Sequence, residues 1–277
     1  SISQCSGETP NDLLDKRDQM DNRLSELVSV RTVEQDDGPL NVFIQSAQSL
    51  VNGILPTPLQ IVPKEFDSGR AEIAIATIGA TAVISDNLTG GKLGAVLDFR
   101  DQVLSPAQNS MGRIAVSLAS EFNRQHTLGM DLAGAAGLDY FAISSPQSAS
   151  SNANSGTATI SVSFDAASIG SLTTDDYVLG FNGAAWSLSR VSDNQAVAMT
   201  GSGSAADPFI VDGLSIEIAG GAAAGDRFQI RPTRSGSSDM DLLIANPREI
   251  AAAATAAPQT TSPVQSVQPP PLQTSSL

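Results

Sequence analysis

Residues Glu121–Phe141 read EFNRQHTLGMDLAGAAGLDYF: the end of a long amphipathic helix, a loop with three glycines, and an aromatic pair. The segment contains the sole histidine of the chain, His126, together with Asp131 and Asp139. It is therefore either a metal or active site or a structural corner. The choice between the two decides the class of function.

The neighbouring residues favour the structural corner. His126 falls at the C-terminal end of the expected helix, where its ring can bond to the last carbonyl groups and interact favourably with the helix dipole. A serine nucleophile that used His126 would be expected in a G-x-S-x-G turn, which the sequence lacks. Catalysis also needs an activated partner, and none is evident. We expect Tyr140 and Phe141 to pack back on the helix.

A calcium loop starting at Asp131 is the second candidate. An EF-hand loop needs oxygen ligands at alternating positions and a bidentate glutamate at its twelfth position. Here leucine and alanines occupy ligand-type positions, and the twelfth residue is Ala142. We expect a turn punctuated by glycines and no calcium.

Three further features also lack the pattern of a site. The run Gly90–Gly94 (GGKLG) does not have P-loop spacing and indicates a helix start. Cys5 has no cysteine or histidine neighbour, so it predicts no metal site, redox pair or internal disulfide. Trp186 is expected in the core or as a lone exposed aromatic. We therefore expect no catalytic, cofactor-binding or metal-binding residues, no cofactor and no enzymatic activity.

Charge and hydropathy exclude two kinds of partner. Lys and Arg number 15 against 29 Asp and Glu, a formal net charge of −14. Nucleic acids and anionic membranes bind basic patches, so we expect neither as a partner. No apolar run approaches the roughly 18 residues of a transmembrane helix. The first residues, SISQCSG, lack the basic and apolar regions of a cleavable signal peptide.

Hydrophobic spacing predicts an α+β fold: an elongated helical spine of long antiparallel helices with two inserted β-rich domains. The expected parts are a spine of residues 1–30, 86–130 and 237–257, a small β excursion of residues 31–85 packed on it, an outer β-rich domain of residues 131–236, and a disordered Pro/Ser/Gln tail of residues 258–277.

The first helix is expected after the capping pattern of residues 9–12 (TPND). Leu13, Met20 and Leu27 form a coiled-coil-like seam that Arg17 interrupts. The return helices are expected at residues 238–244 and 250–257, the second behind a cap at residues 246–249 (NPRE).

Residues 91–125 carry the longest helical pattern, with a kink or a restart expected at Ser105-Pro106. Leu118 lies on one of its apolar stripes, and we expect it to be buried. The two stripes consist of Leu93, Val96, Leu97, Val103 and Leu104, and of Met111, Ile114, Ala115, Leu118 and Phe122.

Period-two patterns and turn signals predict the strands. Asp176–Phe181 and Ala185–Arg190 flank Asn182–Ala184, a strong hairpin signal. Ser144–Gly156 is expected as a linker into the outer domain, which is predicted to be a sandwich or small barrel. The other expected strands are 31–35, 41–46, 59–62, 72–76, 82–84, 157–164, 196–200, 208–211, 214–218 and 227–231, with turns at 36–39 and 52–53.

Several motifs together resemble a known family. They are NDLLDKRDQM (Asn11–Met20), GKLGAVLDFR (Gly91–Arg100), EFNRQHTLGMD (Glu121–Asp131), GLDYF (Gly137–Phe141), the hairpin DYVLGFNGAAWSLSR (Asp176–Arg190) and SDMDLLI (Ser238–Ile244). The chain resembles the family of flagellar hook-associated protein 1, FlgK, over most of Thr9–Ala253. The helix–loop segment is the most specific part of the resemblance.

The resemblance implies a structural subunit of the bacterial flagellum that joins hook to filament by axial packing of its helical spine. The implied partners are copies of itself in a ring, the hook protein, the second hook-associated protein and a flagellar export chaperone. The implied location is extracellular, at the hook–filament junction, after export by the flagellar type III pathway.

Family members begin and end with long amphipathic helices. Against that pattern the chain is expected to be a fragment or a truncated gene product, and in isolation a monomer. The alternative hypothesis is a secreted, adhesin-like module that binds a surface through residues 144–231. An enzyme is the third class, which a screen for hydrolase activity with His126→Ala would test.

Overall fold

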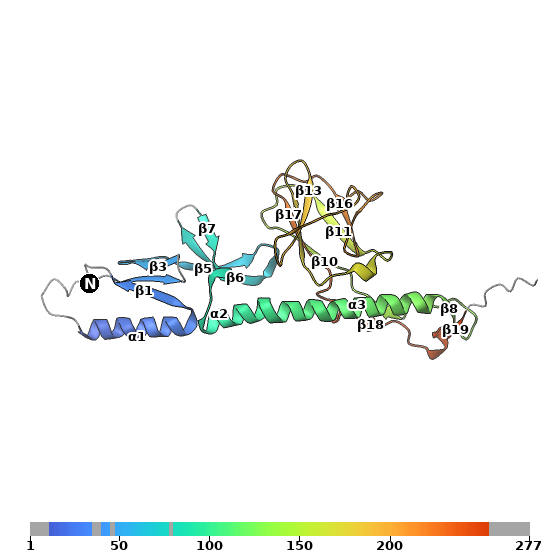
Figure 1. Ribbon diagram of the computed structural model, residues 1–277, viewed down its shortest axis with the longest axis horizontal. Helices are drawn as coiled ribbons and strands as arrows, with labels where there is room; N and C mark the ends of the chain where they lie inside the picture. The colour runs from blue at the N-terminus through green and yellow to red at the C-terminus, as the bar shows by residue number, and fades with distance from the viewer. Residues whose placement is uncertain (1–10, 35–39, 45–47, 78–79, 255–277) are drawn as a thin grey trace, which may run out of the picture. The chain divides into compact units, whose positions relative to one another are not determined.

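The structure, a computed structural model, describes residues 11–34, 40–44, 48–77 and 80–254. It is a mixed α/β fold with one long helix and many β-strands (Figure 1). The chain divides into two compact units: unit 1 comprises residues 1–120 and 142–241, and unit 2 comprises residues 121–141 and 242–277. The predicted limits of spine, β excursion and outer domain stay a prediction. Cys5, Thr9, Pro10, the turn 36–39 and the tail 258–277 lie outside the described residues.

Helix α1 (Asn11–Leu27) in unit 1 turns a mixed face inward. Its partly buried residues follow helical spacing: Leu14, Arg17, Asp21 and Leu24. Leu24 packs against the core formed by Val28, Ile44, Leu50, Ile75, Ile84 and Leu88. The predicted seam of Leu13, Met20 and Leu27 flanks this face and is exposed.

Two antiparallel sheets complete this part of unit 1. The first has the order β1-β2-β3-β4, and the second has the order β5-β6-β7. The bounds are β1 (Val30–Glu34), β2 (Leu40–Ile44), β3 (Gln48–Asn52), β4 (Leu55–Pro56), β5 (Leu59–Lys64), β6 (Asp67–Thr77) and β7 (Ala80–Val83). Strands β5 and β6 form a hairpin whose turn is Glu65-Phe66. We call Glu65, Phe66 and Asp67 the hairpin tip.

In space, the long helical segment begins beside the C-terminal end of α1, although Gly91 is far from Leu27 in the sequence. After a short 3-10 turn, η2 (Ser85–Asn87), helix α2 (Gly91–Asp98) leads through a π-helical turn, η3 (Phe99–Leu104), into helix α3 (Ser105–Thr127). A Cβ at Gly91 would lie 2.4 Å from the backbone carbon of Leu27, so only glycine permits this approach. The expected helix start at this glycine run is confirmed.

The irregularity predicted at Ser105-Pro106 takes the form of the π-helical turn. The Ser105 amide donates to the carbonyl of Arg100, five residues back, which is the π pattern. Pro106 has no amide hydrogen to bond to the preceding turn. The helix therefore restarts as α3 with its hydrogen-bond register displaced.

The outer β domain in unit 1 is a sandwich of two antiparallel sheets. One has the order β10-β17-β12-β13-β14 and the other β11-β16-β15. The bounds are β10 (Gln147–Ser150), β11 (Thr159–Phe164), η4 (Ile169–Ser171), β12 (Tyr177–Phe181), β13 (Trp186–Arg190), β14 (Ala196–Val197), β15 (Phe209–Val211), β16 (Leu214–Ala219) and β17 (Arg227–Arg231).

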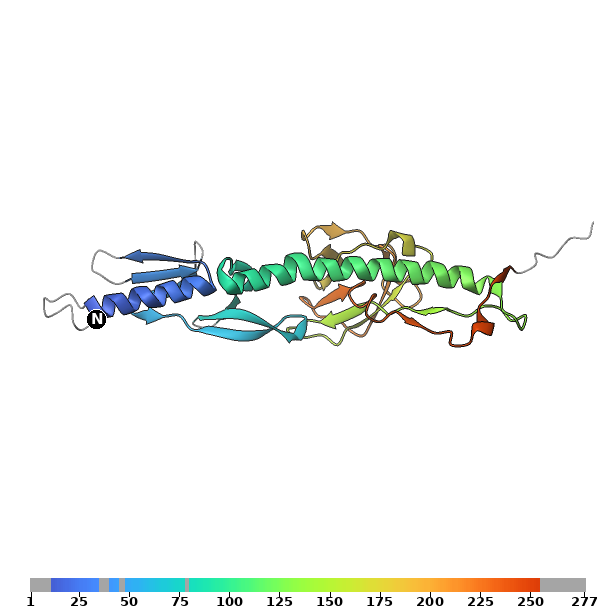
Figure 2. The ribbon, with the colours of Figure 1, turned by 90° about the horizontal axis from the view of Figure 1, so that it is seen from below.

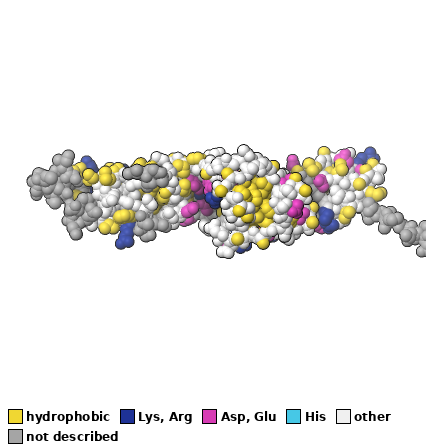
Figure 3. Space-filling model, turned by 90° about the horizontal axis from the view of Figure 1, so that it is seen from above, with side chains coloured by type: hydrophobic (Ala, Val, Ile, Leu, Met, Phe, Trp, Pro, Cys, Tyr) yellow, Lys and Arg dark blue, Asp and Glu magenta, His cyan; other side chains and the backbone are white. Residues whose placement is uncertain are grey.

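Inward-facing side chains of both sheets form the core of this domain. Tyr177, Leu179, Leu188, Leu214, Ile216, Phe228 and Ile230 are all at most 1% exposed. The hairpin predicted around Asn182–Ala184 is confirmed: β12 pairs with β13, and Phe181 stands opposite Trp186. Figure 3 shows hydrophobic side chains gathered on the surface over this domain.

Unit 2 contains short elements around the loop that follows α3. They are β8 (Gly129–Met130), η5 (Pro247–Glu249) and β19 (Ala253–Ala254), with β9 (Phe141–Ala142) and β18 (Asp241–Leu242) where the chain changes unit. Strand β19 pairs with β8, Ala253 opposite Met130.

The predicted return helices are wrong where the chain is described. Residues 238–244 contain β18, and Leu243 donates to the carbonyl of Tyr140. The cap at Asn246 forms, since its side chain accepts from the Arg248 amide, but it closes only the turn η5. Of the alanine-rich run after it, Ala253 and Ala254 form strand β19 and residues 255–257 lie outside the described part. Isolated helices shorter than about 12 residues are marginal, and pairing with β8 outweighs local propensity here.

The expected long antiparallel helices are likewise absent from the described residues. Ser29, just after α1, donates to Thr89, just before α2, so these helices follow one another end to end (Figure 2). In the described ranges no helix has both the length and the hydropathy of a membrane span.

Candidate functional site

The buried face of α3 is built from small and polar residues. In unit 1 its buried residues are Asn109, Gly112, Ala115, Val116 and Ala119. Asn109 Nδ2 donates to the Thr174 carbonyl and to Asp176 Oδ1, both at 3.0 Å. Val116 joins the core of the outer β domain. This face therefore anchors the sandwich to the helix.

Gly112 allows the closest of these approaches. A Cβ built at this position would lie 1.6 Å from the backbone oxygen of Thr233, in the segment that leaves the outer domain. No side chain fits that space. The helix and the exit segment are thus in direct backbone contact.

The opposite face of α3 is apolar and exposed. Met111, Ile114 and Leu118 follow spacings of three and four residues, which places them on one side of the helix. We call these three residues the apolar stripe; they are 63%, 63% and 56% exposed. The prediction that Leu118 is buried is therefore wrong. The small residues of the other face, and not the large ones, make the close contacts.

Large apolar side chains are exposed on the preceding turns as well. They are Val96 on α2 and Phe99, Val103 and Leu104 on the π-helical turn. Isolated exposed apolar residues are normal, but a long series on one helical segment marks an interaction surface.

His126, the first candidate from the sequence, is a buried structural residue in unit 2. The Ala251 amide donates to Nε2 at 2.9 Å, so Nε2 is the acceptor and Nδ1 carries the hydrogen that bonds to the Leu138 carbonyl at 2.5 Å. Both ring nitrogens are thus bonded to backbone groups. The ring joins the glycine-rich loop and the returning chain to the end of the helix.

The aromatic pair packs beside this histidine, as expected. The ring centroids of Phe122 and Tyr140 are 4.8 Å apart, and those of His126 and Tyr140 are 5.4 Å apart. Asn123, which sequence reasoning did not single out, holds the pair: its Oδ1 accepts from the Tyr140 and Phe141 amides at 2.9 Å each. A short amide side chain in a helix carries no sequence signal of such a role.

Asp131 caps a turn. Its Oδ1 accepts from the Ala133 and Ala135 amides, both at 2.8 Å, which is an Asx-type arrangement. Within the described ranges, no three His, Cys, Asp or Glu side chains gather in a way that could hold a metal ion. Trp186 is half-buried and packs on Phe181, with ring centroids 4.9 Å apart.

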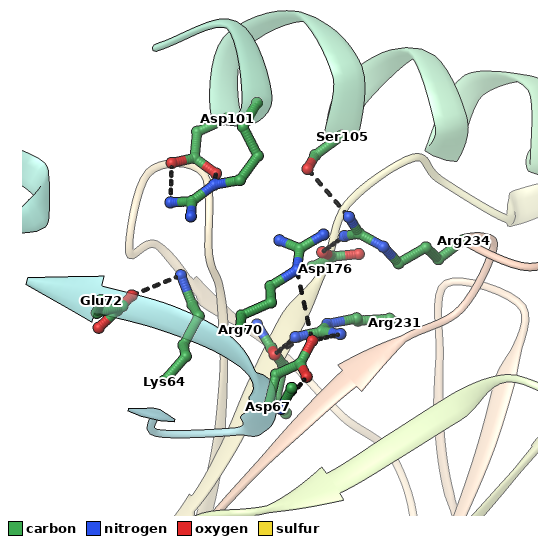
Figure 4. Close-up of polar contacts among 12 residues, drawn as sticks. Lys64, Asp67, Arg70, Glu72, Asp101, Ser105, Asp176, Arg231 and Arg234 are labelled. Atoms are coloured by element: carbon green, nitrogen blue, oxygen red, sulfur yellow. Dashed lines mark hydrogen bonds and ion pairs between the residues drawn. The ribbon is translucent and has the colours of Figure 1, made fainter. Parts of the chain in front are cut away.

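A charged cluster in unit 1 was not predicted (Figure 4). Asp67 at the hairpin tip pairs with Arg231 of β17 at 3.2 Å and with Arg70 at 3.5 Å. Arg234 donates to Ser105 Oγ at 3.1 Å and lies 3.9 Å from Asp176. The sequence gives no sign of this cluster because Asp67 and Arg231 are 164 positions apart.

Burial and charge shift the pKa values in this cluster. Burial raises the pKa of Asp176, against the hydrogen bond from Asn109 and the charge of Arg234. Burial alone would also raise the pKa of Asp67, but the hydrogen bond and charge of Arg231, the Gly69 amide and the charge of Arg70 bring it below its ordinary value. The cleft beside them, which Asp101 and Arg234 help to line, has a volume of about 450 Å³.

Comparison with known proteins decides the family. Residues 1–141, just over half of the 277 residues, match the flagellar hook-associated protein FlgK helical domain. The chain belongs to the FlgK family. Residues 148–232 match the D2-like domain of flagellar hook-associated protein 1, which corresponds to the outer β domain.

Individual FlgK relatives agree with this assignment. Flagellar hook-associated protein 1 of Salmonella typhimurium is 34% identical over 249 residues, covering 89% of this chain and 44% of the relative. The Escherichia coli protein of the same name is 33% identical over 249 residues, covering 89% and 45%. The chain thus spans less than half the length of these relatives.

A solved FlgK structure has the same fold. The flagellar hook junction protein FlgK from Burkholderia pseudomallei matches with a TM-score of 0.80 and 35% identity, over 91% of this chain and 46% of that chain. The resemblance stated from the motifs is therefore confirmed.

Proposed function

We propose that this chain contributes to a structural subunit of the bacterial flagellum, joining hook to filament by axial packing of its long helix. The observation that carries the proposal is the apolar stripe of α3, whose side chains are exposed while the helix's small residues anchor the sandwich. A helix with apolar residues on both faces is suited to packing between its own domain and a neighbour.

The partners and location follow as parts of the same proposal. The proposed partners are copies of itself in a ring, the hook protein, the second hook-associated protein and an export chaperone. The names of the relatives support a place at the hook junction. The proposed position is extracellular, at the hook–filament junction, after type III export. The proposed role is structural and involves no catalytic, cofactor-binding or metal-binding residues. The adhesin-like alternative is set aside because the relatives carry the name of a hook-associated protein.

The test introduces a charge on the stripe of the full-length protein in flagellated cells that lack their own copy. Leu118→Asp is expected to lower the amount of protein in sheared hook–filament preparations at least tenfold and to reduce swimming. Ser117→Asp, one residue along on an exposed polar position, adds the same charge and is the control.

Intact mass spectrometry of the sheared preparation identifies the native species. Incorporation of Leu118→Asp at the level of Ser117→Asp would remove the stripe from the assembly surface and overturn the proposal. Both variants are first shown to fold by their melting curves.

A further inference from the structure

The hairpin tip rests on the outer surface of the sandwich. Along β17, Phe228 and Ile230 point into the core, so Arg227, Gln229 and Arg231 share the opposite face. Arg227 bonds to both carboxylate oxygens of Glu65 at 3.1 Å, and Arg231 bonds to Asp67 at 3.2 Å. Figure 4 shows Asp67 and Arg231 pointing toward one another.

This contact combines two ion pairs that solvent reaches with a buried aromatic side chain and a backbone hydrogen bond. The Arg227 and Glu65 side chains are 48% and 37% exposed. Beside Asp67 and Arg231 there is a cavity of about 400 Å³, also lined by Gln147 and Gln229. Phe66, 9% exposed, supplies the apolar part, with the Arg227 guanidinium 5.4 Å from its ring centroid. The Asn152 amide also donates to the Glu65 carbonyl at 3.2 Å. Ion pairs that reach solvent are screened by salt.

The contact between α3 and the sandwich is more deeply buried and does not rest on ion pairs to the helix. Val116 is 1% exposed and lies within the sandwich core. Gly112 and Thr233 are in backbone contact, and Asn109 is 5% exposed with two hydrogen bonds into the domain. Buried apolar and hydrogen-bonded contacts of this kind respond little to salt, because mobile ions do not enter them.

We propose that the hairpin tip is a salt-sensitive latch on the outer β domain. When Glu65–Arg227 and Asp67–Arg231 are screened, Phe66 and the Asn152–Glu65 hydrogen bond alone hold the hairpin tip. A state detached from β17 then becomes populated, while the domain stays anchored to α3. The latch then sets how far the domain can move against the sheet β5-β6-β7. It stands on these contacts alone and does not depend on the proposed junction role.

Fluorescence energy transfer between two labels on the full chain tests the latch. Gln60→Cys on β5 and Ala205→Cys in the outer domain are both exposed sites, and Cys5→Ser removes the native thiol. We expect one distance at about 0.1 M salt, and a second, longer distance to appear at about 1 M, where the Debye length falls to roughly 3 Å.

The variant Glu65→Gln with Asp67→Asn is expected to show the second distance already at about 0.1 M salt, and to lose most of the response to added salt. Its matched control is Glu26→Gln with Asp18→Asn, which makes the same charge changes at ion pairs to Lys92 and Arg17. The control should behave like the unmodified chain. A single distance that stays unchanged in the latch variant at every salt concentration would overturn the proposal.

Discussion

Two single residues, Gly112 and His126, are tightly constrained by neighbouring backbone groups. At Gly112 the Thr233 oxygen occupies the space of a side chain. At His126 the ring bonds on both sides to main-chain groups, Leu138 and Ala251. At both positions the surrounding backbone, and not local helix propensity, determines which residue fits. The free energy needed to move that backbone therefore determines how much a substitution destabilises the fold.

Replacement of Gly112 tests the first constraint. We expect Gly112→Ala to lower the free energy of unfolding by about 1–3 kcal/mol, because the new methyl group displaces the backbone near Thr233. Gly170→Ala is the control, since a Cβ there meets nothing within 4 Å. Urea unfolding of both variants measures the difference. Equal midpoints would show that the exit segment moves aside freely.

Replacement of His126 tests the second. His126→Ala removes the partner of the Leu138 carbonyl and of the Ala251 amide, at about 0.5–1.5 kcal/mol for each of these partly buried hydrogen bonds. We expect faster hydrogen exchange at the Ala251 amide and no change in any hydrolase activity. Gln125→Ala, at an exposed neighbouring position, should leave that exchange rate unchanged. An unaltered Ala251 amide in His126→Ala would contradict the structural role.

The pKa of Asp67 predicts a pH dependence. Because its folded-state pKa lies below the unfolded value of about 4, the unfolded chain binds the extra proton. The stabilisation by Asp67 is present above that value and is lost as pH falls through the folded pKa. Groups facing it are Arg231 from β17, and Arg70 and the Gly69 amide from its own strand.

Unfolding of the unmodified chain and of Asp67→Asn, compared between about pH 5 and pH 3, measures this effect. The difference in unfolding free energy should shrink as pH falls. Asp176 gives the unfolding free energy the opposite pH dependence, since its pKa is raised. Both proteins contain Asp176, so its contribution cancels in the difference between them. A difference that is constant with pH would rule out the Asp67 contribution.

At the scale of elements, the two faces of α3 reverse the usual rule for a surface helix. Large apolar residues point outward, and alanine, glycine and asparagine point inward. Small residues bring the helix close to the sandwich, and the large ones remain free for another surface. This arrangement gives neighbouring positions on one helix opposite sensitivities to charge.

The pair Leu118 and Ala119 makes that contrast measurable. Ala119→Asp puts a charge at a position that is 1% exposed, and we expect a loss of more than about 3 kcal/mol of stability. Leu118→Asp should cost less than about 1 kcal/mol, because the position is 56% exposed. Thermal melts of both variants decide the matter. Similar melting temperatures would mean that the assigned faces are wrong.

Local sequence patterns predict the elements that carry their own signals. The hairpin of β12 and β13 follows from its turn residues, and β17 coincides with its predicted range. Strand β10 was missed inside an expected linker, because Gln147–Ser150 has no apolar alternation and exists by pairing with β17. Helical spacing found α3 but reversed its faces, since it weighs large apolar residues more than small ones. The ion pair of Asp67 and Arg231 has no local sequence signal, because the two residues are 164 positions apart.

For the molecule as a whole, charge and exposed apolar surface act in opposite directions. The stripe of α3 favours association, while the net charge of −14 makes copies repel one another at low ionic strength. We expect the isolated chain to be a monomer at micromolar concentration in about 0.1 M salt. Light scattering tests this directly. Concentration-dependent growth in mass under those conditions would show that the stripe overcomes the repulsion.

The outer β domain enters and leaves the rest of unit 1 at one place. Gln147 on its first strand pairs with Arg231 on its last, so the two ends are neighbours in the same sheet. Whatever lies between these ends can change in length or identity during evolution without altering the path of the chain on either side. The same position suits protein engineering. A foreign domain with adjacent termini could replace the residues between 147 and 231, and the apolar stripe of α3 would keep its sequence.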